Sequence, residues 1–298
     1  MSPAVRGRSF VLAAAALWSL SGAITKSIDL DGLTIAFYRG MFAGLVLLPL
    51  VPRSKWVFPP VMVPLGLAFG AMTGLFLASM KATTAANTIY LQYTATFWVV
   101  PIGYLFLGEK PDRRAGWSIG LAMVGIAVIV RYGHSGRPDE WKGIVLGLGS
   151  GVAYAVVAVG LRGLRGLDPI WLSAVNNLSG AAALLAWMIA THAPPALPTL
   201  PQGVALAVFG VVQMAIPYTL FARGLRDVSA PEAGLIALAE PILNPLWVFL
   251  VTHERPSTPT LVGGSLLLSG VALRYLAFPA GKVKESKRPS TDHATTGS

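Results

Sequence analysis

The sequence contains no cysteine, so disulfide bonds, thiolate metal sites and cysteine nucleophiles are all excluded. Charge is also scarce: 12% of the 298 residues are Asp, Glu, Lys or Arg, against about 25% in a typical soluble domain. The four histidines lie in segments between apolar runs, at their ends or in the tail, and no two have a metal-binding spacing on one helix. A G-x-S-x-G nucleophile motif is missing as well. A soluble domain and an enzyme are therefore both disfavoured, and no metal or cofactor is expected.

Apolar residues dominate instead, at 54% of the chain, with a mean hydropathy of +0.63. They fall into ten runs, each about long enough for the ~20 residues that cross a ~30 Å hydrocarbon core. The runs are 9–27, 33–51, 61–80, 85–107, 115–131, 141–161, 169–191, 203–224, 231–251 and 259–278. The sequence predicts an all-α integral membrane protein with ten transmembrane helices and a disordered tail over 279–298.

The first run follows Arg6 and Arg8 and has the form of a secretory signal, with small residues at 21–23. A retained first helix is the favoured interpretation, because nine further runs follow and this one has a counterpart in the second half.

Basic residues are distributed unequally between the two sides of the predicted bundle. If the N-terminus is cytoplasmic, the loops on that side and the tail hold most of the 23 Lys and Arg residues. The positive-inside rule then places both termini on the cytoplasmic side of a bacterial inner membrane. Termini on the same side require an even number of spans, which agrees with ten. The net charge of +10 is explained by topology, and no nucleic-acid partner is expected.

The two halves share a pattern. Residues 107–111 (Leu-Gly-Glu-Lys-Pro) correspond to 252–256 (Thr-His-Glu-Arg-Pro) at an offset of 145, and the starts of the fourth and ninth runs match at the same offset. We therefore predict one five-helix repeat over 9–131 and a second over 141–278. Because five is odd, the second repeat enters the membrane from the opposite side, which produces inverted repeats around a central cavity.

The chain resembles the ten-helix bacterial branch of the drug/metabolite transporter superfamily, with two EamA-type repeats. The residues carrying the likeness are Ala14 to Ser19, Phe37 to Gly40, the two Glu-containing helix ends and the Gly-rich fifth and tenth runs. The resemblance implies a bundle with a central cavity and the transport of a small metabolite. His253 departs from the usual Gly of the helix-end pattern, and we expect Glu109 and Glu254 to pair with nearby basic residues.

Two ionisable side chains lie inside predicted spans, where burial of a charge costs ~2.5–3.5 kcal/mol on insertion scales. These are Arg39 in the second run and Glu240 in the ninth. They can serve structure, by pairing with each other or with Asn176 or Asn177, or they can bind substrate. Helical spacing places Glu240, Asn244 and Trp247 on one face. The predicted substrate-binding residues are Trp18, Arg39, Asn87, Tyr90, Thr94, Tyr154, Asn176, Asn177, Gln213, Glu240, Asn244 and Trp247.

A P-loop motif is absent, which excludes ATP as a driver within this chain and favours a secondary transporter using alternating access. A channel is disfavoured because no repeated ion-lining motif is present. An acid and a base in one cavity suit an amino acid, so export of amino acids, aromatic ones included, is the first hypothesis. Export of a drug or another cationic or amphipathic metabolite is the alternative. The expected partners are this small molecule, the lipid bilayer and protons as a candidate coupling ion.

Overall fold

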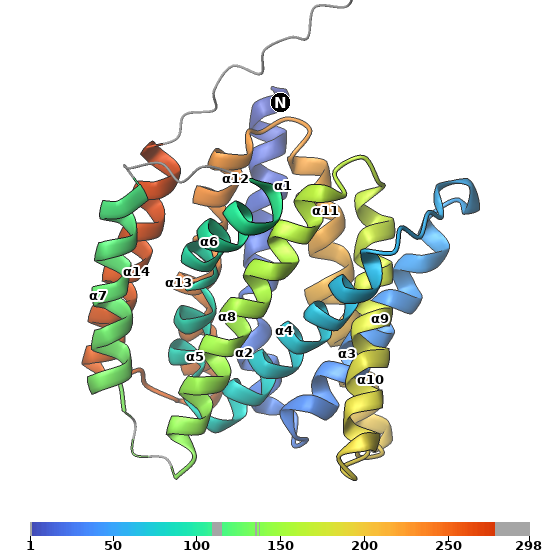
Figure 1. Ribbon diagram of the computed structural model, residues 1–298. Coiled ribbons are helices and arrows are strands. Elements are labelled where there is room, and N and C mark those ends of the chain that lie inside the picture. Colours follow the sequence, from blue (N-terminus) through green and yellow to red (C-terminus); the bar gives the residue numbers. More distant parts are fainter. Residues whose placement is uncertain (1, 109–114, 135, 137, 278–298) are drawn as a thin grey trace, which may run out of the picture.

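A computed structural model describes residues 2–108, 115–134, 136 and 138–277. The described part consists of helices joined by short connections (Figure 1). In the first half these are α1 (Pro3–Trp18), α2 (Ser21–Ser27), α3 (Gly32–Leu47), η1 (Leu48–Leu50), η2 (Arg53–Lys55), α4 (Met62–Ala82), α5 (Ala85–Gln92), α6 (Ala95–Leu107) and α7 (Ala115–Tyr132). In the second half they are α8 (Glu140–Gly163), α9 (Pro169–Ala190), α10 (Leu200–Phe209), the π-helical η3 (Gly210–Ala215), α11 (Ile216–Gly224), α12 (Ala230–Ala237), α13 (Ala239–Thr252) and α14 (Thr258–Ala277).

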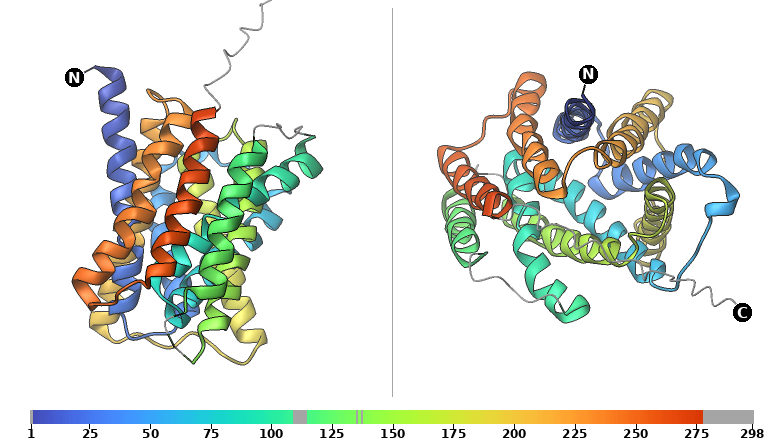
Figure 2. Two further views of the ribbon diagram at one scale, coloured as in Figure 1. Left: turned by 90° about the vertical axis from the view of Figure 1, so that its left-hand side faces the viewer. Right: turned by 90° about the horizontal axis from the view of Figure 1, so that it is seen from above.

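These elements reproduce the ten predicted spans, and several spans consist of two helices in line. Seven segments of the described chain are long and apolar enough to cross a membrane, namely 3–27, 32–50, 62–82, 140–163, 169–190, 200–224 and 231–252, and 116–132 is a shorter apolar helix. The α5–α6 pair and α14 run through the same bundle (Figures 1 and 2). Large apolar side chains cover the outside, among them Phe106 and Trp117. The protein is therefore an all-helical multi-pass membrane protein.

The predicted duplication is visible in the helix ends. Thr84 caps α5 and Ser229 caps α12, each accepting a hydrogen bond from the backbone N–H three residues later. Gly108 and His253 end α6 and α13, both in the left-handed conformation. Both pairs of residues are 145 apart, as the sequence comparison predicts. The helix-end residues Glu109 to Pro111 and the tail 279–298 lie outside the described residues.

A second pair of caps marks the entry into α3 and α9. The Asp31 carboxylate accepts hydrogen bonds from the backbone N–H groups of Leu33 and Thr34. The Asp168 carboxylate accepts the corresponding bonds from Ile170 and Trp171. Burial opposes ionisation of Asp168, but the Lys55 ammonium 2.7 Å away and the two N–H donors outweigh it, so the pKa of Asp168 is lowered. Carboxylates at these positions also match the positive end of each helix dipole.

The second half is inverted relative to the first. In Figure 1, α1 runs away from the end of the bundle that carries the N-terminus, whereas its counterpart α8 begins at the opposite end and runs back. Helices of different halves pack side by side throughout: α7 with α14, α4 with α8, α3 with α9, and α1 with α11. Glycines permit the closest approaches, since a Cβ on Gly125 would lie 2.4 Å from the carbonyl oxygen of Gly263. The halves thus form one interdigitated bundle.

Candidate functional site

A cavity of about 670 Å³ lies between the halves. Its walls come from α1, α3, α4, α8, η3, α11 and α14, and from the two interrupted spans α5–α6 and α12–α13. Of the predicted site residues, the structure brings Trp18, Arg39, Tyr154, Gln213 and Glu240 together around this cavity. Such a volume is within the range of pockets for small organic molecules.

Arg39 lies midway along α3 and is only 3% exposed. Its Nη1 donates to Gln213 Oε1 at 3.0 Å, and its guanidinium lies 5.2 Å from the centre of the Phe209 ring. Its Nε has no hydrogen-bond partner among the described residues. A buried donor of a charged group is costly to leave unsatisfied, so this nitrogen is suited to meet an anionic ligand.

Gln213 holds this arginine in place from a π-helical segment, η3. Its Nε2 donates to the Trp18 carbonyl at 3.2 Å, where α1 ends, while its Oε1 accepts from Arg39. A π-helical turn displaces side chains from the positions of a regular α-helix and is frequent at functional sites. The amide thereby links three spans at the wall of the cavity.

Glu240 lies just after the break between α12 and α13. Its Oε2 is 3.2 Å from the hydroxyl of Tyr93, which also lies 3.3 Å from the Ala237 carbonyl. Tyr93 itself occupies the matching break between α5 and α6, so the two interrupted spans meet here. Glu240 and Arg39 do not form an ion pair with each other or with any other group in the described chain. Both side chains line the same cavity without a partner of opposite charge among the described residues.

Aromatic rings form much of the remaining wall. The Trp18 ring lies 5.4 Å from that of Tyr218 and 5.3 Å from that of Phe221. Tyr154 and Phe76 line the cavity from α8 and α4. This wall provides apolar contact area beside the two charged groups.

The cavity extends toward the end of the bundle that holds the N-terminus. Arg162 near the end of α8 and Arg274 near the end of α14 line this part of it, and Arg274 donates to the Thr96 carbonyl at the start of α6. Sequence reasoning did not identify Tyr93, Tyr218 or these two arginines as site residues. Their positions at helix breaks and helix ends carry no periodic signal, although Tyr93 aligns at offset 145 with the break next to Glu240.

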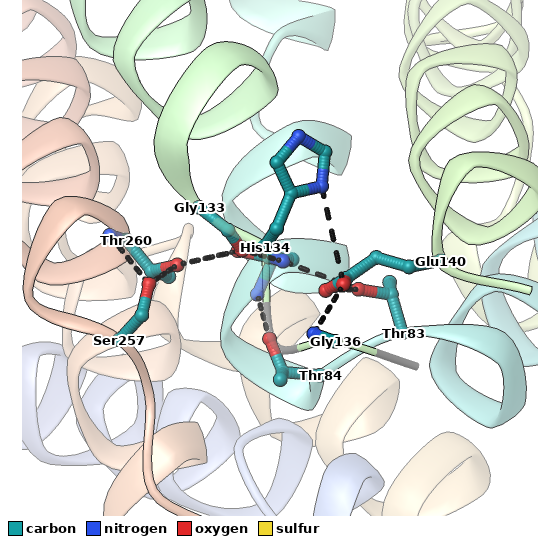
Figure 3. A network of polar contacts seen from close by, with 9 residues as sticks. Thr83, Thr84, Gly133, His134, Gly136, Glu140, Ser257 and Thr260 are labelled. Carbon is teal, nitrogen blue, oxygen red and sulfur yellow. Dashed lines mark hydrogen bonds and ion pairs between the residues drawn. The ribbon is translucent and has the colours of Figure 1, made fainter. Parts of the chain in front are cut away.

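At the opposite end of the bundle, buried residues form a polar network (Figure 3). Glu140, 3% exposed, accepts from the Thr83 hydroxyl and the Gly136 N–H and lies 3.9 Å from His134. Nearby, Lys26 and Glu254 form an ion pair at 3.0 Å with 10% and 9% side-chain exposure. This pair joins α2 to the segment between α13 and α14, and realises the pairing expected for Glu254.

Asn87 belongs to this network and does not line the cavity. Its Nδ2 donates to Thr83 and to the Gly133 carbonyl, and its Oδ1 accepts from Thr260. We call the polar contacts of Lys26, Thr83, Asn87, Gly133, His134, Gly136, Glu140, Glu254, Ser257 and Thr260 the closed-end network.

The remaining predicted residues also lie away from the cavity, in helix contacts. The Tyr90 ring packs against Gly264 of α14, and the Thr94 hydroxyl donates to the Leu91 carbonyl. Asn244 and Trp247 donate to serines of the first span, Ser21 and Ser19. Helical spacing correctly places these two on the face of α13 that meets the first span, but the cavity wall ends at Glu240.

Asn176 and Asn177 lie buried on α9, and neither is hydrogen-bonded to Arg39. Asn177 Nδ2 donates to the Ser173 carbonyl one turn earlier, and the Asn177 backbone lies against Gly40 of α3. The alternative that these amides or Glu240 pair with Arg39 is therefore not what the structure shows, because the Arg39 guanidinium donates to Gln213 instead.

Comparison with known proteins agrees with this architecture. A model of the EamA-like transporter family matches residues 5–131 and again 141–276. A protein of Archaeoglobus fulgidus named "Uncharacterized transporter" is 27% identical over 272 residues, covering 90% of this chain and 96% of the relative. The "Pseudopaline exporter CntI" of Pseudomonas aeruginosa (strain UCBPP-PA14) is 26% identical, covering 84% of this chain and 89% of the exporter.

A solved structure titled "Crystal structure of protein" superposes with a TM-score of 0.65 at 17% identity, covering 91% of this chain and 97% of the other. At that identity the likeness shows the fold alone. With the family model matching both halves, the chain belongs to the EamA-like transporter family and is a multi-pass membrane transporter of the drug/metabolite transporter superfamily.

Proposed function

We propose that the protein is a secondary transporter that exports amino acids, with Arg39 binding the carboxylate and Glu240 the ammonium group. The observation that carries the proposal is one cavity holding two groups of opposite charge type, the buried Arg39 and the half-buried Glu240, that are not paired with each other. Such charges are stabilised when a zwitterion brings the complementary groups. The aromatic wall of Trp18, Tyr218 and Phe221 suits a substrate with an apolar or aromatic side chain.

Direction follows from topology in this proposal. Because most basic residues belong to the end that carries the N-terminus, that end faces the cytoplasm of a bacterial inner membrane. The cavity extends toward this end, so it is loaded from inside the cell. The pseudopaline exporter is similar to this chain over most of the length of both proteins, and its name supports transport in the outward direction.

Alternating access then requires the closed end to open. The closed-end network joins α2, α5, α8 and α14 and the segment after α13, so its contacts cross between the halves. We propose that these contacts break when substrate is released outward. Inverted repeats provide two equivalent arrangements of one fold, one open at each end. Glu240 is the proposed proton-coupling group, because it is the carboxylate within the cavity wall.

The test is uptake of labelled amino acids into proteoliposomes, with and without a pH gradient. Arg39→Gln should lower flux about a hundredfold, since truncating one partner of a buried charge pair costs 2–5 kcal/mol. Glu240→Gln should lower flux and abolish its dependence on the gradient. The matched control is Glu232→Gln, which removes an exposed carboxylate that contacts Arg8 at the surface.

Substrate variants make the assignment specific. An amino-acid amide lacks the carboxylate, so it should be transported poorly by the wild type and lose little more in Arg39→Gln. Equal losses for acid and amide in this variant would refute the carboxylate contact. Saturable flux of an apolar amine that needs Glu240 but not Arg39 would support the alternative, a cationic-drug exporter, for which the aromatic wall beside Glu240 is the favouring observation.

A further inference from the structure

A second cavity lies on the outside of the bundle, along another face of α4, the helix that also lines the charged cavity through Met72, Thr73 and Phe76. It has a volume of about 780 Å³ and follows α4, with α9 and α3 on one flank and α8 on the other. We call it the α4 groove. Small residues of α4 make its floor, namely Gly70, Ala71, Gly74 and Ala78. Leu67 and Trp187 at its sides are 58% and 62% exposed, so the groove opens to the surroundings of the bundle.

The groove is apolar along most of its length and charged at one end. Asp31, Lys81, Asp139 and Lys142 gather there, from the start of α3, the end of α4 and the start of α8. Within the described chain, none of the four forms an ion pair with another. Lys81 uses one donor on the Ile28 carbonyl at 2.5 Å, and an ammonium has three.

The dimensions match one leaflet of a bilayer. From Lys81 to Leu67, α4 advances about 21 Å at 1.5 Å per residue. The helix runs obliquely through the bundle (Figure 1), so the depth across the membrane is smaller than this length. Half of a hydrocarbon core is ~15 Å thick. Trp187 lies near the end of α9 at the charged end of the groove, which is where an interfacial aromatic is expected.

We propose that the α4 groove binds one phospholipid with an amine-bearing, zwitterionic headgroup. One acyl chain lies along the small residues of α4. The phosphate contacts Lys81 and Lys142, and the headgroup ammonium contacts Asp31 and Asp139. Two cations and two anions at one end complement a headgroup that carries one charge of each sign, and small residues leave room for a chain where Leu or Phe would fill it.

The test is native mass spectrometry of the detergent-purified protein after incubation with phosphatidylethanolamine. The Lys81→Gln/Lys142→Gln double variant should retain about thirtyfold less lipid, because each cation near a lipid surface contributes about 1 kcal/mol. Ala71→Leu, which fills the groove from an exposed position, should lower retention as well. The controls are Arg131→Gln, at the same end but outside the groove, and Ala13→Leu, at an exposed position of α1.

A photoactivatable phosphatidylethanolamine, with the reactive group in its acyl chain, locates the bound molecule. Peptides of α4, α8 and α9 should be labelled, and the label should disappear in Ala71→Leu. Equal retention in all variants, or label spread evenly over the bundle, would overturn the proposal. Equal retention of phosphatidylglycerol, whose headgroup has no cation, would overturn the role of the carboxylates. The readout involves no flux, so it succeeds or fails independently of the amino-acid assignment.

Discussion

Replacing Glu254 with Gln should open the closed end of the transporter. The Lys26–Glu254 pair is almost fully buried at 3.0 Å, and Glu254 also accepts from the Ala85 N–H at 2.8 Å, where α5 begins. Glutamine keeps an acceptor for Ala85 but removes the negative charge. The Lys26 ammonium would lose this negatively charged partner and keep its contact with the Thr83 carbonyl at 2.8 Å.

The magnitude follows from the geometry. Two unit charges 3.0 Å apart attract by about 5 kcal/mol at an effective dielectric constant of ~20. Breaking one partner of a buried pair costs 3–5 kcal/mol in other proteins. We expect about 3 kcal/mol here, because Lys26 retains its contact with Thr83. The Lys26–Glu254 pair belongs to the closed form of this end, so its loss should shift the equilibrium between the closed and open forms toward the open form by about a hundredfold.

The absence of cysteine makes the assay direct. An Ala86→Cys substitution places a single thiol at a position that is 1% exposed near the start of α5. Labelling by a membrane-impermeant maleimide should be slow in this background and much faster when Glu254→Gln is added. Ala174→Cys, fully buried in α9, should stay unlabelled in both, which distinguishes opening from unfolding. If Glu254→Gln leaves the labelling rate of Ala86→Cys unchanged, the prediction that the Lys26–Glu254 pair keeps this end closed is refuted.

Three further predictions concern stability, each measured by thermal unfolding of the purified protein. Asn87→Ala should destabilise by about 2–4 kcal/mol, because its three buried partners lose their contacts, whereas Asn87→Ser should lose less. Gly125→Ala should destabilise by about 1–3 kcal/mol through its clash with α14, whereas Gly120→Ala on the same helix has nothing within 4 Å and should be neutral or stabilising; equal effects would contradict the packing. The lowered pKa of Asp168 means that its ionised form stabilises the fold above the ordinary carboxyl pKa of ~3.9, and this stability is lost as the pH falls through the lowered pKa. Asp168→Asn should therefore make the stability less dependent on pH in the acid range. Parallel stability profiles for the wild type and the variant would contradict this linkage.

The positions of the spans could be predicted from the sequence because a membrane imposes one length and one polarity on every crossing. The inverted duplication was equally accessible, since an offset of 145 relates helix starts, helix breaks and the left-handed ends at Gly108 and His253. Arg39 and Glu240 could be found from the sequence because ionisable residues within an apolar run are costly and rare.

Which polar residues face the cavity was decided only by the tertiary structure. Helical spacing places Glu240, Asn244 and Trp247 on one face of a span, yet Glu240 lines the cavity while the other two bind the first span. Helical spacing predicts which residues share a face of a helix, but not which part of the protein packs against that face. Tyr93 reaches Glu240 because two helix breaks 145 residues apart meet in space, and local sequence does not encode that encounter. Membership in a membrane bundle thus follows from composition and pattern, whereas the cavity depends on how the inverted halves interlock.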